Sequence, residues 1–322
     1  MGVNLKDIIL HEPLSFEELK GKVIAIDALN SLYQFLSIIR QPDGTPLMDS
    51  RGRVTSHLSG LLYRTTRLIE YGMKPVYVFD GKPPVLKNRT IEERKEIKRH
   101  AHDEWVRAKE EGRMEDAKKY ASRTSKFTTE MRSDAKKLLE CMGIPCIQAP
   151  SEGEAQCSHL CMRGDAWGVG SQDYDALLFG APHLVKGLTL SGKFELAVIH
   201  LEKALSNVSL TREQLIDVAI LVGTDFNSGV KGIGPKKALK AVKEGKVREL
   251  TLDFDMDEVR NIFLHPETTD DYRLEWKKPD RNALIEFLCK NHEFSLERVN
   301  KAADNLEAAM REFSQKDLSS WF

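Results

Sequence analysis

The stretch SEGEAQCSHLCMRGDAWGVGSQDYD, residues 151–175, organises this chain around two pairs of acidic residues. The pairs stand at its two ends: Glu152 with Glu154, and Asp173 with Asp175. Between them, residues 155–163 predict a short helix closed by Gly164, and the small residues 166–171 predict a strand. Since one helix and one strand return the chain to the same side of a sheet, both pairs can meet at one edge. The stretch therefore predicts an α/β fold with an acidic site.

The acidic pairs also have an ordinary structural interpretation. Ser151-x-x-Glu154 matches a capping box, which starts a helix without any chemistry, and Asp-x-Asp after a strand is common in loops. However, two further strands, in VIAIDA and PVYVFD, also end in an acid, at Asp27 and Asp80. Because open α/β sheets bind ligands beyond the carboxyl ends of their strands, we expect all these acids on one rim.

A rim of carboxylates predicts bound cations. Crowded carboxylates repel one another, and their pKa values rise unless cations neutralise them. Oxygen ligands without paired Cys or His spacing favour Mg²⁺ or Mn²⁺ over Zn²⁺. The five cysteines include no Cys-x-x-Cys pair, so we expect reduced thiols, with a metal role for Cys157 and Cys161 as the alternative.

Composition sets limits on the class of protein. The 322 residues are 41% hydrophobic and 30% charged, which is enough for one large domain or two smaller ones with a core. No apolar run approaches a membrane span, and the N-terminus lacks a signal-peptide core, so we expect a soluble, intracellular (cytoplasmic) protein without membrane contact. The net charge of −1 does not by itself suggest a nucleic-acid partner, so such evidence must come from local patterns.

The first such pattern is the densely charged segment 82–137, which follows Asp80 and contains Lys87 and Arg94. Its interleaved acids form i,i+4 pairs typical of a solvated helical face, which is the alternative interpretation. Because the segment begins directly after an expected metal ligand, its first turns must lie over the acidic site. A basic helix above a carboxylate rim suits a polyanionic substrate.

The second pattern is GTDFNSGVKGIGPKKALKAV, residues 223–242, which also supplies a further acid, Asp225. Gly232-Ile-Gly234 followed by Pro235 at a helix start predicts the turn of a helix-hairpin-helix, whose amides can hold a phosphate. Lys236 and Lys237 add charge, so the element is expected to grip a duplex backbone without reading bases. Residues 251–314 are expected to be helical and show no catalytic pattern.

The chain ends in a tip that carries Leu318, Trp321 and Phe322. Large exposed apolar residues usually mark a binding site. Docking of this tip onto the molecule itself is the alternative.

Together these motifs resemble the flap endonucleases, members of the structure-specific 5′ nuclease family, and most closely the archaeal form. The likeness spans nearly the whole chain, through VIAIDALNSLYQFL, VYVFDGKPPVLK, SEGEAQ, SQDYDALLFG, GTDFNSGVKGIGPKKA and the closing Gln-x-x-Leu-x-x-Trp-Phe. It implies a central, mostly parallel twisted sheet flanked by helices (a PIN-like nuclease core), with a helical arch insertion and a helix-hairpin-helix. The implied division of the chain is 1–98 and 138–256 for the two halves of the nuclease core, 99–137 for the arch, 257–314 for C-terminal helices and 315–322 for the tail.

The resemblance also implies roles for particular residues. The family's metal-binding acids, which are also catalytic, match Asp27, Asp80, Glu152, Glu154, Asp173, Asp175 and Asp225. Its basic catalytic pair on the arch matches Lys87 and Arg94, and its substrate-bending wedge matches the Leu47–Met48 region. Expected DNA contacts are Tyr33 (base stacking), Arg40, Arg64, Glu152, Gly223, Asp225, Gly232, Gly234, Lys236 and Lys237. The tail resembles the motif that docks on the sliding clamp, through Gln315, Leu318, Trp321 and Phe322.

By the same likeness, the expected function is a 5′ flap endonuclease with 5′–3′ exonuclease activity. It would cut branched DNA (5′ flaps, nicked or gapped duplex) by two-metal hydrolysis in Okazaki fragment maturation and repair, as a monomer. Two Mg²⁺ ions are expected, with Mn²⁺ as a substitute, and K⁺ can be shared with DNA at the helix-hairpin-helix. Alternatives on this scaffold are a 5′ exonuclease, an RNA-directed nuclease and a non-catalytic scaffold that holds DNA and the clamp. Whether a strand is threaded or clamped beneath the arch stays open.

Overall fold

The fold is described from a computed structural model, which gives the backbone of residues 2–121, 124, 126–188 and 196–319. The side chains of 88–95, 98, 117–118, 248 and 314–319 lie outside the described part. The strands are β1 (Glu12–Leu14), β2 (Val23–Asp27), β3 (Lys74–Phe79), β4 (Cys146–Gln148), β5 (Gly168–Gly170), β6 (His183–Lys186) and β7 (Leu196–His200). The helices are α1 (Ala28–Ile38), α2 (Ser56–Glu70), α3 (Lys87–Glu110), α4 (Met114–Ala121), α5 (Thr129–Cys141), α6 (Gly153–Met162), α7 (Asp175–Leu178), α8 (Leu201–Val208), α9 (Arg212–Val222), α10 (Pro235–Lys243), α11 (Met256–Leu264), α12 (Arg281–Leu284) and α13 (Leu296–Ser319). Two 3₁₀ turns, η1 (Glu17–Leu19) and η2 (Lys246–Glu249), and one π-helix, η3 (Ile285–Asn291), complete the described elements.

The seven strands form one sheet in the order β1-β7-β6-β5-β2-β3-β4. Strands β4, β3, β2, β5 and β6 run parallel, β7 pairs antiparallel with β6, and β1 pairs antiparallel with β7. The chain builds outward from β2 through β3 to β4 and then returns to the other side of β2 with β5. The strand order therefore reverses between β2 and β5, which is the position where doubly wound sheets bind their ligands.

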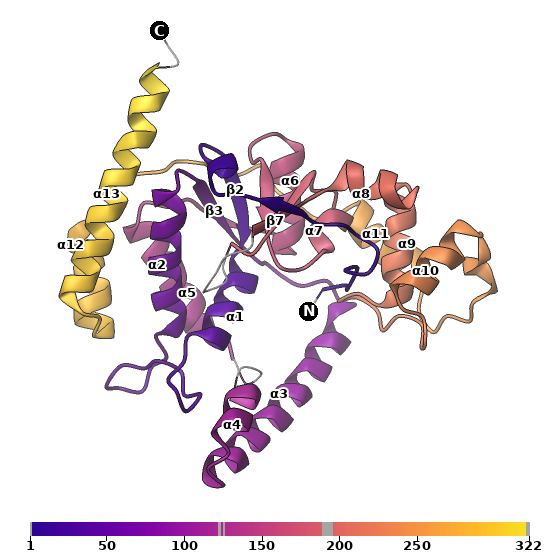
Figure 1. Cartoon of the computed structure of the whole chain (residues 1–322), viewed down its shortest axis with the longest axis horizontal. Coiled ribbons are helices and arrows are strands. Elements are labelled where there is room, and N and C mark those ends of the chain that lie inside the picture. The colour runs from indigo at the N-terminus through magenta and orange to yellow at the C-terminus, as the bar shows by residue number, and fades with distance from the viewer. Residues whose placement is uncertain (1, 122–123, 125, 189–195, 320–322) are drawn as a thin grey trace.

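Helices cover both faces of the sheet, as expected for a mostly parallel sheet (Figure 1). Alternate side chains divide the strands between the two cores: Ala25, Val76 and Val78 belong to one, whereas Ile24, Ile26, Tyr77 and Phe79 belong to the other. The first core is closed by α6, α7 and α9 to α11, and the second by α1, α2, α5, α12 and α13. The expected α/β architecture is thus confirmed.

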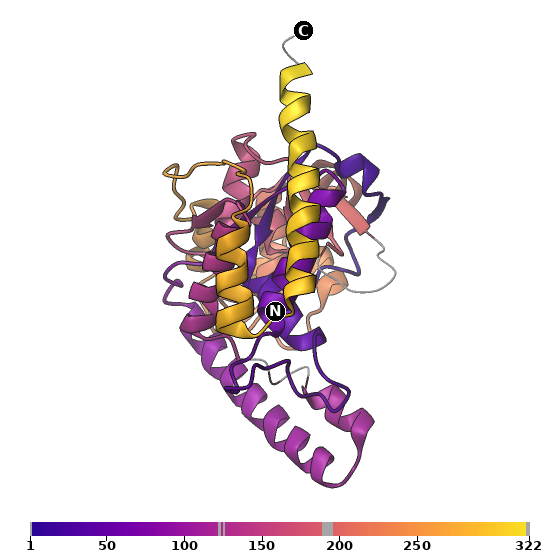
Figure 2. The same ribbon diagram turned by 90° about the vertical axis from the view of Figure 1, so that its left-hand side faces the viewer.

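Two segments leave the compact body. Helices α3 and α4, which we call the arch, project from the edge of the sheet where the parallel strands end, and α13 extends beyond the body on the other side (Figures 1 and 2). The expected boundaries at 98/99 and 137/138 lie inside α3 and α5, so the helical insertion begins at Lys87.

Two further local features are a helix cap and a hairpin. Thr128 caps α5 through Met131 N at 3.2 Å, and the hairpin of β6 and β7 forms, although its connection at 189–195 lies outside the described residues. The expectation that 251–314 is helical throughout was wrong for residues 265–280, which contain no helix or strand. Proline at 266 and 279 explains part of this, because proline cannot donate to a helical ladder. Among the described helices, none combines the length and the apolar character needed to cross a bilayer.

Candidate active site

Five of the seven predicted acids come from the ends of four adjacent parallel strands. Asp27 ends β2, and Asp80 directly follows β3. Asp173 follows β5, and Glu152 and Glu154 follow β4, at the start of α6. The strand order β5-β2-β3-β4 therefore places these carboxylates side by side at the switch point, as expected from the sequence.

Asn30 joins the two sides of the switch point. Its backbone N–H donates to Asp27 Oδ1 at 3.0 Å, and its side-chain amide donates to Asp173 Oδ2 at 2.8 Å. Asp27 is also the residue that caps α1. One asparagine in the first turn of a helix thus orients acids that are far apart in sequence, and no sequence pattern pointed to it.

Helix α6 begins in close contact with Asp80. The N–H of Gly153 donates to Asp80 Oδ1 at 2.6 Å, and a Cβ at position 153 would lie 2.5 Å from the same oxygen. Only glycine permits this approach. The capping-box interpretation of Ser151 was wrong, because Glu152 occupies the N-cap and makes no capping bond with its side chain. Glu154 instead accepts a hydrogen bond from Ser171 Oγ at 2.6 Å, so its carboxylate faces the site.

The N-terminal residues hold Asp175, the sixth acid, at the start of α7. The N–H of Val3 donates to Asp175 Oδ1 at 2.9 Å, and Gly2 packs so closely that a Cβ there would lie 2.7 Å from this carboxylate. The seventh acid, Asp225, lies after α9 and is buried. The role of the N-terminal segment was missed, because its residues carry no chemical signal.

The clustered acids have raised pKa values. Burial, and then the neighbouring Asp80, raises the pKa of Asp27 well above its usual value. Burial, and then Asp175 and Asp173, does the same to the pKa of Glu154. For Asp175, burial followed by repulsion from Asp225 and Asp173 raises the pKa to about 7. The site therefore holds more negative charge than its own residues neutralise.

Lys87, the first residue of α3, supplies part of the missing positive charge. Its ammonium donates a hydrogen bond to Glu152 and lies 3.7 Å from Asp225 Oδ2. Burial alone would lower its pKa, but Glu152, Asp80 and Asp225 together raise that pKa above its usual value. The basic residue expected above the rim thus reaches into it.

The donor set suits a hard divalent cation, because it consists of carboxylate oxygens that are crowded and buried. Within the described residues, no group of three or more His, Cys, Asp or Glu side chains is arranged to hold one metal ion. Each of five acids already accepts a hydrogen bond from the protein. The pairs are Asn30 to Asp173, Ser171 to Glu154, Gly153 N to Asp80, Val3 N to Asp175 and Lys87 to Glu152. The positive charge of the Lys87 ammonium partly neutralises Glu152 and Asp225, as a bound metal ion would.

Two expected DNA contacts, Tyr33 and Arg40, lie on or just after α1, the helix that begins directly after Asp27. Tyr33, on α1, is half-buried with its ring 5.8 Å from that of Phe127, between their centres. The Arg40 guanidinium donates to the carbonyl oxygens of Leu36 and Gly44, both at 2.8 Å. In the predicted wedge, Met48 is 44% exposed, so an apolar surface does follow α1.

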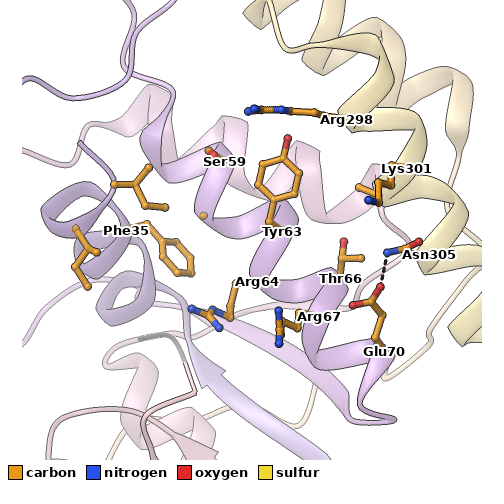
Figure 3. A pocket seen from close by; sticks show the side chains of 14 residues that line it. Phe35, Ser59, Tyr63, Arg64, Thr66, Arg67, Glu70, Arg298, Lys301 and Asn305 are labelled. Carbon is orange, nitrogen blue, oxygen red and sulfur yellow. Dashed lines mark hydrogen bonds between the residues drawn. The ribbon is translucent and has the colours of Figure 1, made fainter. Parts of the chain in front are cut away.

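Arg64 lines a cavity of about 750 Å³ between α1, α2 and α13. Arg67, Arg298 and Lys301 line it as well, beside the ring of Tyr63, as Figure 3 shows. Arg298 and Lys301 come from α13, more than 200 positions from Arg64 in the sequence. The sequence of α2 alone therefore does not indicate that they line this cavity. The cavity offers several positive charges to an anionic ligand.

The predicted helix-hairpin-helix consists of α9, the connection 223–234 and α10. Gly232 has a φ of +82°, the left-handed conformation that glycine adopts without strain, and Gly234 precedes Pro235 at the start of α10. Gly223, with a φ of +108°, ends α9. Lys237 Nζ donates to the Gly232 carbonyl at 3.0 Å, so an ammonium already lies at this turn.

Several expected residues lie outside the described part. The helical backbone carries Arg94, Gln315 and Leu318, but their side chains are not described, and Trp321 and Phe322 lie beyond the described residues. The five cysteines are free, and Cys157 and Cys161 are buried, in agreement with reduced thiols.

A doubly wound sheet with clustered acids at its switch point, and a lysine at the start of a charged helix reaching into them, is the arrangement expected of an α/β nuclease. Comparison with known proteins narrows this class. Residues 1–101 match the XPG N-terminal domain, and residues 143–225 match the XPG I-region. The chain is 52% identical to flap endonuclease 1 of Methanococcoides burtonii, with all of both chains covered, and 51% identical to that of Pyrococcus abyssi, with all of this chain and 98% of the relative covered.

Solved structures agree. The flap endonuclease-1 structure from Methanococcus jannaschii matches with a TM-score of 0.81 at 43% identity, over 97% of this chain and 99% of that one. The catalytic core of Rad2 in complex with DNA substrate matches with a TM-score of 0.73 at 26% identity, over 95% of this chain and all of that one. The chain belongs to the flap endonuclease family, and it is a nuclease.

Proposed function

We propose that this protein cuts branched DNA at the base of a 5′ flap by hydrolysis that depends on divalent metal ions, in replication and repair. The observation that carries this proposal is the convergence of Asp27, Asp80, Glu152, Glu154, Asp173, Asp175 and Asp225 beneath the first turn of α3. Family membership supports the same activity.

Two Mg²⁺ or Mn²⁺ ions held by these acids would activate a water and stabilise the leaving oxygen of the scissile phosphodiester. Seven acids exceed what two ions coordinate directly, because magnesium keeps several waters. Some of the carboxylates would therefore contact a metal ion only through its bound waters. Lys87 and Arg94 stabilise the charge that develops on the phosphate, and Tyr33 stacks on the unpaired base next to it.

Three basic surfaces support a nucleic-acid substrate. The cavity with Arg64 and Arg298, the turn with Lys236 and Lys237, and the arch lie on separate elements. These groups can contact phosphates without reading bases, so the shape of the junction sets specificity. The arch adds selectivity, because a single strand fits beneath a helical pair more readily than a duplex does. The Gly232 carbonyl, which already accepts from an ammonium, suits a K⁺ ion shared with DNA.

The tail supports a further partner. Helix α13 carries the chain away from the body (Figure 2), so a terminal Gln-x-x-Leu-x-x-Trp-Phe sequence can reach another protein. We propose docking on the sliding clamp through Gln315, Leu318, Trp321 and Phe322.

A cleavage assay tests the proposal. Asp173→Ala should reduce cleavage of a double-flap DNA in Mg²⁺ by at least about 10³-fold, as loss of a group essential to transition-state stabilisation does, whereas flap affinity measured in Ca²⁺ changes little. The matched control is Asp253→Ala, which removes an exposed acid that is not one of the seven. Near-normal turnover of Asp173→Ala would disprove the assignment, and equal cutting of flap and plain single strand would favour a simple exonuclease.

A further inference from the structure

The outer end of α3 rests on the turn that follows α1. Lys109 Nζ lies 2.8 Å from Asp43 Oδ2 and 3.4 Å from Thr45 Oγ1. The Trp105 indole donates to the Asp43 carbonyl at 3.5 Å, and the Lys109 ammonium lies 5.8 Å from the centre of the Trp105 ring. We call Asp43, Trp105 and Lys109 the outer contact.

The turn that α3 contacts is held by hydrogen bonds of its own. The N–H of Gln41 donates to the Thr45 carbonyl at 2.8 Å, and the N–H of Gly44 donates to the Gln41 carbonyl at 2.9 Å. Thr45 donates to the Asp43 carboxylate twice, from its N–H at 2.9 Å and from its hydroxyl at 2.7 Å. Arg40 ties the same turn to α1 through the Gly44 carbonyl. The Asp43 carboxylate is therefore held in place by local bonds that do not involve the arch.

Helix α3 is thus attached to the body at both ends. Lys87 bonds to Glu152 at the inner end, and Lys109 bonds to Asp43 at the outer end. Helix α3 follows β3, and the turn that it contacts follows β2 and α1. The two segments therefore leave neighbouring strands of the sheet. At 1.5 Å per residue the helix spans about 36 Å, so a shift at its outer end would move residues along it by amounts that grow with distance from Lys87.

Such a shift has consequences for the basic groups of α3. If the outer end moved by about 6 Å, a residue a third of the way along α3, where Arg94 lies, would move by about 2 Å. Displacement of a reacting group by about 1 Å can cost about 10²-fold in rate. Loss of the outer contact would therefore be enough to displace the basic groups of α3 from the carboxylates.

We propose that Asp43, Trp105 and Lys109 are positioning residues, which hold the arch so that the basic groups of α3 meet the scissile phosphate. The proposal rests on the proposed function, in which Lys87 and Arg94 act on that phosphate. It also connects the arch to the turn between Arg40 and the predicted wedge, so the segment expected to bend the DNA and the segment expected to act on it share one attachment.

Charge reversal tests the proposal. Asp43→Lys and Lys109→Glu should each lower the single-turnover rate at saturating protein about fivefold, because an exposed ion pair contributes no more than this to a docking equilibrium. Flap affinity should change less than twofold for Asp43→Lys. The double exchange Asp43→Lys with Lys109→Glu should restore the rate. Arg107→Glu is the matched control, since it makes the same charge change on the same helix but breaks only a pair with Glu104 within α3.

Hydrogen exchange of α3 gives a second measurement that does not depend on cleavage. Amides near Trp105 should exchange faster in each single variant and return to the wild-type rate in the double variant. A rate loss in Arg107→Glu as large as in Lys109→Glu, or a double variant that recovers neither rate nor protection, would overturn the proposal. If the wild-type protein cut no flap, the proposed function would fail, while hydrogen exchange would still show whether the outer contact holds α3.

Discussion

At the scale of single residues, the Lys87 ammonium has two competing partners, a carboxylate of the site and the scissile phosphate. Its ammonium pairs with Glu152 in the structure, and a scissile phosphate would compete for the same ammonium. We therefore expect Lys87→Ala to reduce the single-turnover rate by about 10²-fold, as loss of one charge-stabilising donor does, with flap affinity changed less than threefold. Lys82→Ala, which removes an exposed cation from the same connection, is the control. Equal losses of rate and affinity would make Lys87 a binding residue instead.

His57 supports a prediction about pH. It is fully buried on α2, and neither ring nitrogen has a hydrogen-bond partner among the described residues. Burial, and then the nearby His292, lowers its pKa to about 4. Since an unfolded histidine binds its proton near pH 6.5, the unfolded state gains protons first as the pH falls. The free energy of unfolding therefore drops between pH 7 and pH 4, by about 3 kcal/mol for this residue.

The measurement for His57 is a difference between two proteins. The clustered acids have raised pKa values and change stability in the opposite direction over part of this range, so the wild-type curve alone is not informative. Urea unfolding in EDTA at several pH values, for wild type and His57→Gln, isolates the contribution. Parallel curves for the two proteins would show that His57 does not titrate as its burial implies.

The acids could be predicted residue by residue, whereas the groups that orient them could not. An Asp at the end of a strand, as in VIAIDA, is a local signal that the sheet then places. Asn30, Ser171 and the N–H of Val3 act through contacts made only after folding, across as many as 172 positions of sequence. No local pattern encodes such distances.

At the scale of elements, helices and strands with clear boundaries were predictable, and the arch less so. Strand β2 ends at the predicted acid Asp27, and β3 ends directly before the predicted acid Asp80. The arch was expected to start at residue 99, but this position lies inside α3. Charged residues on a solvated helix look alike inside and outside an insertion, so they do not mark where an insertion begins. The π-helix η3 was not foreseen, since its pattern differs little from that of an α-helix.

The turn between α9 and α10 yields a prediction of its own. If Lys236 and Lys237 contact duplex phosphates, Lys236→Ala with Lys237→Ala should lower the salt dependence of flap binding by about 0.9 per lost contact. The rate at saturating protein should not change, because both lysines lie on α10, which carries none of the seven acids. Lys246→Ala is the control, since this exposed lysine pairs with Glu244 at 2.6 Å. An unchanged salt slope in the double variant would remove the turn from the DNA contacts.

At the scale of the whole molecule, the site joins segments that would otherwise be independent. Its acids come from the ends of three strands, from α6, α7 and the end of α9, and the N-terminal residues close it. A cation bound there is a cross-link between these segments, so binding should stabilise the fold as a ligand does, by about 2.7 kcal/mol at a hundredfold excess over Kd. The same arrangement makes the metal-free protein carry unfavourable charge at its centre.

Asp175 tests whether repulsion between the carboxylates destabilises the metal-free protein. Its pKa of about 7 means that ionisation at pH 8 occurs at a cost, because the carboxylate is buried among Asp225, Asp173 and Glu154. The folded state binds this proton more tightly than the unfolded state does, so the metal-free protein becomes more stable as the pH falls from 8 towards 4. Asp175→Asn removes the charge and keeps an acceptor for Val3 N, and it should raise stability in EDTA at pH 8 by on the order of 2 kcal/mol. Thermal unfolding in EDTA and in Mn²⁺ should then show a smaller metal-induced rise for Asp175→Asn than for wild type, while flap cleavage is lost. If the variant were less stable than wild type in EDTA at pH 8, carboxylate repulsion would not be what the metal ions relieve.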